Sequence, residues 1–308
     1  MCTTCGCSDD ANPTLTDLQT RETVSLGVPN MVHHHDHDHD HDHDHDHDHD
    51  RDHDHDDGRD HQHYRSHPTA QAVIPASPPQ DAAKKIRLDQ AVLAKNNQLA
   101  ERNRGWFAAR SILALNLVSS PGSGKTTLLE RTLRELSGEF EFHVIEGDQA
   151  TTLDAERIRA TGCRVVQVNT GSGCHLEADM LARGLQQLDP PMNSVLMIEN
   201  VGNLVCPALF DLGERAKIVI ASVTEGEDKP VKYPHMFRAS EVLLLNKIDL
   251  LPHLDFDLSR FLDYARQVNP ALEVFQISAK TGEGVEAWHE WIRAQSQKRP
   301  QLIGSEFS

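Results

Sequence analysis

A glycine-rich segment that contains one lysine follows an apolar run at residues 112–118 and opens a helix-forming stretch. This order of strand, loop and helix is the context that a phosphate-binding loop requires. Glycines let backbone N–H groups turn towards phosphate oxygens, the Lys125 ammonium can reach the β- and γ-phosphates, and the Thr126 hydroxyl can ligate Mg²⁺. A glycine-rich turn without a ligand is the alternative interpretation. The predicted nucleotide-binding residues of this segment are Ser119, Ser120, Pro121, Gly122, Ser123, Gly124, Lys125, Thr126 and Thr127.

A second nucleotide motif follows the apolar run at residues 242–245. Asn246-Lys247-Ile248-Asp249 resembles the guanine-recognition motif of GTPases, in which the aspartate accepts hydrogen bonds from two guanine nitrogens in a way that adenine cannot reproduce. Ser278-Ala279-Lys280 follows another apolar run and resembles the accessory guanine-contact motif of the same proteins. We therefore predict that the nucleotide is GTP. The expected guanine-site residues are Asn246, Lys247, Asp249, Ser278, Ala279 and Lys280.

Two further carboxylates, Asp148 and Glu199, stand at the ends of apolar runs. Ligands of parallel sheets gather at the carboxyl ends of strands, so either group could meet Mg²⁺ or orient the attacking water. Each could instead be a solvated acid at a strand end. The segment 199–202, Glu-Asn-Val-Gly, stands where the usual GTPase has Asp-x-x-Gly and offers no glutamine, so we expect slow intrinsic hydrolysis. The expected catalytic residues are Lys125, Thr126, Asp148 and Glu199.

Three cysteines, Cys2, Cys5 and Cys7, lie close to the α-amino group. Three thiolates and one amine suit a four-coordinate, soft metal site, and square-planar Ni²⁺ is as reasonable an occupant as tetrahedral Zn²⁺. The alternatives are an oxidation-prone tail and a set of iron–sulfur ligands.

A second candidate metal site is predicted from Cys174, His175 and Cys206, which come shortly after strands that feed the nucleotide site. A metal held by these residues could sense which nucleotide is bound. Asp179 follows His175 by one helical turn and is a weaker candidate ligand. The alternative is that the cysteines act as small buried hydrophobes, which is how we interpret Cys163.

Composition separates a tail from a core. Residues 33–67 hold 15 of the 20 histidines and, with 13 aspartates and three arginines, carry ten of the 17 net negative charges. Alternating imidazole and carboxylate groups favour several weakly held divalent ions, and a purification tag is the rival explanation.

The acidity of the chain argues against nucleic-acid and membrane partners. With no apolar stretch of membrane-spanning length and no secretory signal, we expect a cytoplasmic protein with reduced cysteines.

The predicted architecture has three parts. Residues 1–80 should be a disordered metal-binding tail, residues 81–111 an amphipathic helix with Ile86, Val92, Leu93 and Leu99 on its apolar stripe, and residues 112–308 a P-loop domain. Apolar runs alternating with helical patterns predict an α/β fold, a mainly parallel sheet with helices on both faces. Strands are expected at 112–118, 142–145, 165–168, 195–198, 218–223, 242–245 and 274–277, and helices at 126–136, 176–188, 256–268 and 285–293.

With these residues in place, the chain closely resembles the hydrogenase nickel-incorporation GTPases, accessory proteins that help to load nickel into [NiFe] hydrogenase. Only about residues 8–80 lie outside the resemblance. The matching segments are Met-Cys-Thr-Thr-Cys-Gly-Cys at 1–7, Lys-Asn-Asn at 95–97, Ala-Glu-Arg-Asn at 100–103, the phosphate loop at 118–127, Val-Ile-Glu-Gly-Asp-Gln at 144–149, Asn-Thr-Gly at 169–171, Gly-Cys-His-Leu at 173–176, the stretch 198–207, Ser-Val-Thr-Glu-Gly-Glu-Asp-Lys-Pro at 222–230 and Lys-Tyr-Pro-His-Met-Phe at 232–237.

The resemblance implies a tight nickel site at the N-terminal cysteines, a weaker nickel or zinc site at Cys174, His175 and Cys206, and Mg²⁺ near Thr126, Asp148 and Glu199. It also implies a homodimer promoted by GTP, with contacts at leucines matching Leu250 and Leu254, which could equally be packed within the chain. The implied partners are a small zinc-containing accessory protein that receives nickel and the precursor complex of the hydrogenase large subunit. The histidine tract departs from shorter-tailed members and suggests added nickel storage.

Three other functions fit part of the pattern. A urease-type nickel GTPase shares a histidine-rich start and a phosphate loop, but the cysteine cluster and the Glu-Asn-Val-Gly segment favour the hydrogenase family. A nickel store with a residual GTPase site is a binding-protein alternative. A zinc or cobalt chaperone is the third, because cysteine and histidine ligands accept all three metals.

Overall fold

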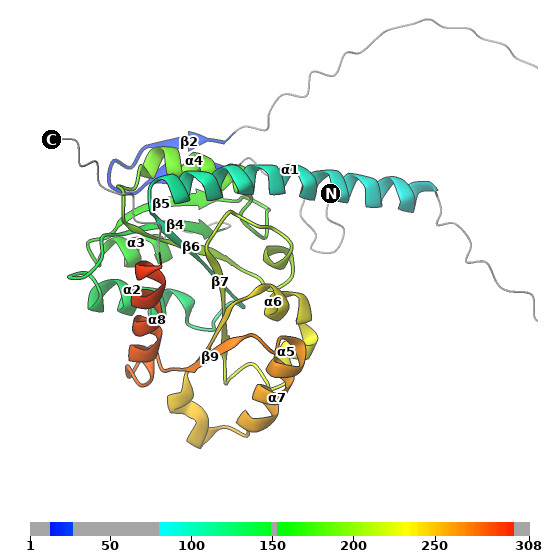
Figure 1. Cartoon of the computed structure of the whole chain (residues 1–308), viewed down its shortest axis with the longest axis vertical. Helices are drawn as coiled ribbons and strands as arrows, with labels where there is room; N and C mark the ends of the chain where they lie inside the picture. Colours follow the sequence, from blue (N-terminus) through cyan, green and yellow to red (C-terminus); the bar gives the residue numbers. More distant parts are fainter. Residues whose placement is uncertain (1–12, 27–79, 149–152, 299–308) are drawn as a thin grey trace, which may run out of the picture. The chain divides into compact units, whose positions relative to one another are not determined.

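Residues 13–26, 80–148 and 153–298 are described by the computed structural model of the chain (Figure 1). They form a nine-stranded sheet in the order β2-β1-β5-β4-β6-β3-β7-β8-β9. The seven strands from β3 to β9 run parallel, and all seven strands expected from the sequence are confirmed. The strands are β1 (Thr14–Asp17), β2 (Thr23–Ser25), β3 (Leu113–Ser119), β4 (Phe142–Asp148), β5 (Arg164–Asn169), β6 (Val195–Gly202), β7 (Ala216–Ser222), β8 (Val242–Asn246) and β9 (Glu273–Gln276).

Helices cover both faces of this sheet, as the sequence predicts. Alternate residues of β3 separate the two sides: Leu115 packs with α2, α3 and α8, whereas Ala114 packs with α1 and α4. A third apolar cluster joins α6 and α7 to β7 and β8. The helices are α1 (Gln80–Ala109), α2 (Lys125–Glu135), α3 (Leu153–Arg159), α4 (Ala178–Leu188), α5 (Lys229–Lys232), α6 (Pro234–Ala239), α7 (Leu258–Val268) and α8 (Val285–Gln297), with short 3₁₀ helices η1 (Cys206–Ala208) and η2 (Ile248–His253).

The prediction that residues 1–80 are a disordered tail is wrong at residues 13–26. These residues form a hairpin in which β1 pairs antiparallel with β5, so that Leu15 lies opposite Val168. Leu15 and Leu26 are buried in the cluster that also holds α4, and Arg183 of α4 donates to the carbonyl oxygen of Leu26 at 2.9 Å. The strands are too short to show periodicity, and Leu15 of β1 is buried only because a distant strand offers an edge. The rest of the predicted tail, residues 1–12 and 27–79, lies outside the described residues.

The helix expected at 81–111 is confirmed as α1, but its buried face differs from the predicted apolar stripe. Val92 is exposed and Leu93 and Leu99 are half-buried, whereas Asn96, Ala100, Asn103 and Phe107 are buried. This face carries two amides because it covers backbone groups that need hydrogen bonds. Within the described part of the chain, no helix is both long and apolar enough to cross a membrane.

The hairpin provides a stability test. Leu15→Ala should lower the free energy of unfolding by about 2–4 kcal/mol, because it opens a cavity beneath β5. Val24→Ala on the neighbouring strand is the matched control: Val24 is 55% exposed, and its truncation should change stability by less than about 0.5 kcal/mol. Urea denaturation of both variants measures the difference. Equal stabilities would show that the hairpin does not pack on the core.

Candidate functional site

The carboxyl ends of the parallel strands β3, β4 and β6 meet at one edge of the sheet, as expected for a ligand site in an α/β fold. A cleft of about 580 Å³ opens there. The structure therefore brings together the phosphate loop, one of the predicted carboxylates and part of the guanine motif. The residues lining the cleft are Ser119, Ser120, Pro121, Gly122, Ser123, Gly124, Lys125, Thr126, Thr127, Glu146, Gly147, Asp148, Asp154, Arg157, Val201, Gly202 and Lys247.

The phosphate loop leaves β3 at Ser119 and enters α2 at Lys125. Gly124 precedes the helix with a φ of 93°, a conformation that side-chain-bearing residues rarely adopt. A Cβ atom added to Gly124 would also lie 2.5 Å from the side-chain nitrogen of Asn246. Glycine is thus required twice here, for the turn and for the close approach of the guanine motif.

Glu199 does not line the cleft itself, but it is the centre of the polar contacts made by the side chains of Lys125 and Thr126. Its side chain is fully buried, and Oε1 accepts hydrogen bonds from Lys125 Nζ at 2.8 Å and from the Thr126 hydroxyl at 2.6 Å. Among the described residues, no donor reaches Glu199 Oε2. Three of the four predicted catalytic residues are therefore in direct contact.

Glu146 is a site residue that was not predicted from the sequence. It lies opposite Glu199 in the parallel register of β4 and β6, is 2% exposed and lines the cleft. Burial, with the nearby charge of Glu199 adding to it, raises the pKa of Glu146 to about 9. The signal available in the sequence was an acid directly after the apolar pair Val144 and Ile145, two residues before Asp148.

The residues at this edge fit a magnesium ion. Hard oxygen ligands suit Mg²⁺, and the Thr126 hydroxyl, the carboxylate of Asp148 at the end of β4 and Oε2 of Glu199, which has no partner among the described residues, provide them. When bound, such an ion would withdraw negative charge from the phosphates. The buried Glu199 oxygen supports this fit most strongly, because an acceptor left without a donor is costly in the interior.

The guanine motif also holds the phosphate loop in place. Asn246 Nδ2 donates to the carbonyl oxygen of Ser123 at 2.9 Å, and Lys247 Nζ donates to that of Gly122 at 2.6 Å. Asn246 Oδ1 accepts from the backbone N–H of Ala279 at 2.9 Å and so joins the two guanine segments. These residues therefore join the phosphate loop to the two guanine segments, a role that was not predicted from the sequence.

Asp249 remains as the group that can read the base. Its Oδ1 accepts a hydrogen bond of 2.6 Å from the Ser278 hydroxyl, which orients the carboxylate. Arg131 of α2 holds the same loop by donating to the carbonyl oxygens of Ala279 and Lys280, at 2.7 and 3.1 Å. The predicted guanine residues from β8 and from the segment after β9 thus come together beside the phosphate loop, and Lys247 is the one among them that lines the cleft.

Cys174, His175 and Cys206 come together as predicted. Their possible ligand atoms all lie within 4.8 Å of one another, and Cys174 Sγ is 3.7 Å from His175 Nδ1. Burial lowers the pKa of His175 to about 4, so that the imidazole is neutral and able to bind a metal. The ring of Phe210 packs on the imidazole with a centroid distance of 3.9 Å. Two soft thiols and one imidazole suit Ni²⁺ or Zn²⁺.

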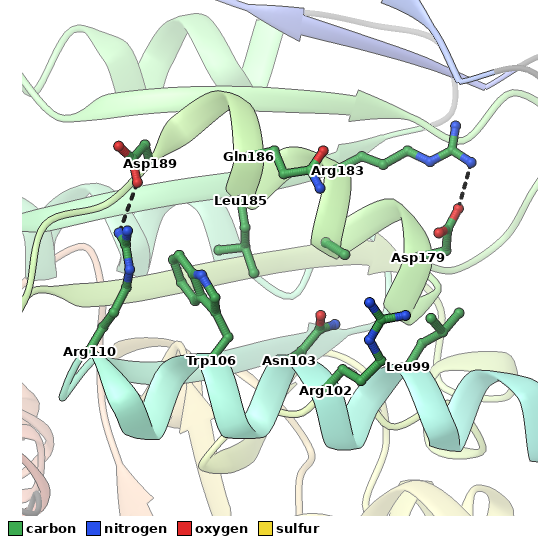
Figure 2. Close-up of a pocket in the computed structure, with 11 residues that line it drawn as sticks. Leu99, Arg102, Asn103, Trp106, Arg110, Asp179, Arg183, Leu185, Gln186 and Asp189 are labelled. Atoms are coloured by element: carbon green, nitrogen blue, oxygen red, sulfur yellow. Dashed lines mark hydrogen bonds and ion pairs between the residues drawn. The ribbon is translucent and has the colours of Figure 1, made fainter.

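The structure does not bring Asp179 into this cluster. Asp179 forms an ion pair of 2.9 Å with Arg183, one turn further along α4. Figure 2 shows this pair on the rim of a separate hollow between α1 and α4, where Arg110 and Asp189 form a second pair at 2.8 Å. The prediction of Asp179 as a further ligand is therefore wrong: its position on the helix directs it to an arginine. Cys2, Cys5 and Cys7 lie outside the described residues.

The fold, the phosphate loop and the guanine motif together define a P-loop GTPase. A family model described as the CobW/HypB/UreG nucleotide-binding domain matches residues 113–276. The chain is 59% identical over 210 residues to the hydrogenase maturation factor HypB of Escherichia coli K12, covering 68% of this chain and 72% of that protein. The chain belongs to the CobW/HypB/UreG family and, within it, to the hydrogenase maturation GTPases, which are GTP hydrolases.

Two solved structures of relatives are also similar. The crystal structure of HypB from Helicobacter pylori in complex with nickel has a TM-score of 0.63 and 35% identity, and covers 68% of this chain and 99% of its own. That of HypB from Archaeoglobus fulgidus has a TM-score of 0.62 and 36% identity, and covers 66% and 99%. These matches confirm the parallel sheet with helices on both faces.

Base recognition gives the test of this site. Asp249→Asn should weaken GDP binding by about 100-fold, because the amide no longer accepts two hydrogen bonds from guanine. The same variant should gain affinity for xanthosine diphosphate, whose additional carbonyl accepts from the amide. Asp255→Asn, which changes an exposed acid shortly after η2, is the control and should bind both nucleotides as the unmodified chain does. Fluorescent-nucleotide titrations measure all affinities, and unchanged GDP binding by Asp249→Asn would contradict the assignment.

Proposed function

We propose that this GTPase stores nickel and delivers it for the maturation of [NiFe] hydrogenase, and that GTP binding and hydrolysis control dimerisation and metal transfer. The observation that carries the proposal is the position of the Cys174, His175 and Cys206 cluster. Cys206 lies in η1, only a short segment after β6, the strand that carries Glu199, so β6 leads from the nucleotide carboxylate to one of the candidate metal ligands. The relatives named as hydrogenase maturation factors, one of them solved with nickel, support this function.

In this proposal Lys125 contacts the β- and γ-phosphates, while Thr126, Asp148 and Glu199 hold Mg²⁺. The nucleotide is held by the residues from Ser119 to Thr127 and by the guanine motifs. Lys125 Nζ donates to Glu199 at 2.8 Å in this structure; with Mg²⁺ and GTP bound, Glu199 would help to hold the ion and the ammonium would face the phosphates. Such a change in the partners of Glu199 would act on β6 and on the segment that leads to Cys206.

Slow hydrolysis remains the expected behaviour, and the neighbour of Glu199 supports it. Asn200 is the only amide side chain beside this carboxylate in the segment 199–202. It is buried, and its Oδ1 accepts from the backbone N–H groups of Leu176 and Val201 at 3.2 and 3.0 Å. An amide held in this way cannot orient an attacking water as the glutamine of Ras-type enzymes does.

The remaining parts of the proposal concern metals and partners. Cys2, Cys5 and Cys7 would form the tight nickel site, and the histidine and aspartate tract would add storage. The core cluster would hold nickel or zinc, since its ligands accept both. Leu254 is 39% exposed on the segment after η2 and Leu250 is half-buried, which fits a dimer contact there. The proposed partners are a small zinc-containing accessory protein and the precursor of the hydrogenase large subunit.

Loss of the lysine should separate hydrolysis from metal binding. Lys125→Ala should reduce GTP hydrolysis to background, because the charge that faces the phosphates is removed. The tight nickel site at the N-terminal cysteines should keep its affinity, since it does not depend on the phosphate loop. Phosphate release and nickel competition with a chromophoric chelator measure the two properties. Loss of both would contradict the division into separate sites.

The proposed switch predicts that nucleotide changes metal affinity at the core cluster. We would titrate nickel and zinc into the full-length chain and into a Cys174→Ser, Cys206→Ser variant, each with GDP and with a non-hydrolysable GTP analogue. The difference between the two proteins isolates the core site from the tail. Its affinity should change by about tenfold between nucleotides. If the metal affinity of the core site were the same with GDP and with the GTP analogue, metal storage would be the better-supported function.

A further inference from the structure

A buried lysine lies directly behind the segment that carries Cys206. Lys217 is on β7 and is 8% exposed. Its Nζ donates to the carbonyl oxygen of Pro207 at 2.7 Å and to that of Phe210 at 3.1 Å. Pro207 follows Cys206 directly, and Phe210 is the residue whose ring packs on His175. One ammonium group therefore holds the backbone at two points directly after Cys206.

The charge of this lysine is balanced inside the protein. Glu214 is buried, and its Oε1 lies 3.8 Å from Lys217 Nζ. Burial lowers the pKa of Lys217, and Glu214 opposes the shift. The other oxygen of Glu214 accepts from the backbone N–H of Leu212 at 2.7 Å. A buried ion pair with its remaining groups hydrogen-bonded is costly to disturb, so it keeps one geometry.

The same glutamate reaches towards the nucleotide site. Glu214 Oε1 accepts from Asn116 Nδ2 at 3.0 Å, and Asn116 Oδ1 accepts from Asn200 Nδ2 at 3.3 Å. Asn200 directly follows Glu199 in β6. Its Oδ1 also accepts from the backbone N–H of Leu176, the residue after His175. A continuous chain of buried polar groups therefore runs from the neighbour of the nucleotide carboxylate to both metal-ligand segments.

We propose that Lys217 is a positioning residue for the core metal site, and that the buried chain through Glu214, Asn116 and Asn200 transmits movement of β6 to it. This inference rests on the proposed function of Cys174, His175 and Cys206 as metal ligands. Preorganised ligands bind a metal more tightly than ligands on a loose loop, because less freedom is lost on binding. The backbone carbonyls that Lys217 holds are the means by which Cys206 keeps its place.

The test follows each cysteine separately in the full-length chain. The protein is exposed to N-ethylmaleimide at a series of buffered free Zn²⁺ concentrations, and alkylation of each cysteine is measured by peptide mass spectrometry. In the unmodified chain, Zn²⁺ should slow alkylation of Cys174 and Cys206. In Lys217→Met, the Zn²⁺ concentration that gives half-protection of Cys206 should rise about tenfold, since two hydrogen bonds from a charged donor are lost. Protection of the N-terminal cysteines should not change.

Three further variants separate positioning from general damage. Lys232→Met is the matched control, because Lys232 is an exposed lysine that pairs with Asp228 at 2.7 Å, and it should behave as the unmodified protein does. Lys217→Arg keeps the charge and its donors and should restore part of the protection. Lys217→Gln repeats the test with a neutral donor should the methionine variant fail to fold. GDP affinity and the slow alkylation of buried Cys163 report folding in every case.

The outcomes distinguish the positioning role of Lys217 from the proposed metal site on which it rests. Half-protection of Cys206 at the same Zn²⁺ concentration in Lys217→Met and in the unmodified chain would overturn the inference alone. Absence of Zn²⁺ protection at Cys174 and Cys206 in the unmodified chain would overturn the metal site itself, and the inference with it.

A second variant tests the transmission. Asn116→Leu removes the two hydrogen bonds through which Asn116 links Glu214 to Asn200. It leaves the contacts of Lys217 with the backbone of Pro207 and Phe210 in place. The difference in half-protection of Cys206 between GDP and a non-hydrolysable GTP analogue, expected in the unmodified chain, should fall at least threefold in this variant. An undiminished difference would refute the link, whereas it would leave the positioning role of Lys217 standing.

Discussion

The burial of the Glu199 carboxylate is the constraint on which the nucleotide site depends. A carboxylate inside a sheet is unfavourable unless donors and cations surround it. Lys125 and Thr126 supply those partners, and both lie in the first turn of α2. The need to satisfy Glu199 therefore fixes where α2 begins relative to β6. It also explains why Oε2 of Glu199, which no donor of residues 13–26, 80–148 or 153–298 reaches, is suited to a metal ion.

Strand β6 carries a ligand of the proposed magnesium site and leads to a ligand of the proposed core metal site. Hard oxygen ligands at the end of β6 suit Mg²⁺ and phosphate, while the thiols and imidazole of the core cluster suit softer ions. Only a short segment of chain separates Glu199 from Cys206. Asn200 and Asn203 in this segment contact the backbone of Leu176 and Cys174, and the Lys217 ammonium holds the backbone directly after Cys206. Rigid packing around a short connection is what allows a small movement at one site to reach another.

Helix α1 contributes to this arrangement through its amides. Asn96 Oδ1 accepts from the backbone N–H of Ala178 at 2.9 Å, and Asn103 Nδ2 donates to the carbonyl oxygen of the same residue at 2.9 Å. The two asparagines also donate to the carbonyl oxygens of Asp211 and Leu212. Helix α1 thereby holds the start of α4, just after His175, beside the segment that follows Phe210. Polar residues on a buried helix face are explained by backbone groups that would otherwise lack partners.

The sequence by itself determined the local chemistry: the phosphate loop, the guanine motif and the seven parallel strands, because contiguous motifs and apolar periodicity express themselves over a few neighbouring residues. Only the tertiary structure decided which strands are neighbours. The pairing of Glu146 with Glu199, the hairpin on β5 and the contact of Asn246 with Ser123, 123 positions away, all follow from the sheet order. The order of strands cannot be predicted from the periodicity of single segments, because the apolar pattern of a strand is the same whichever strand pairs with it.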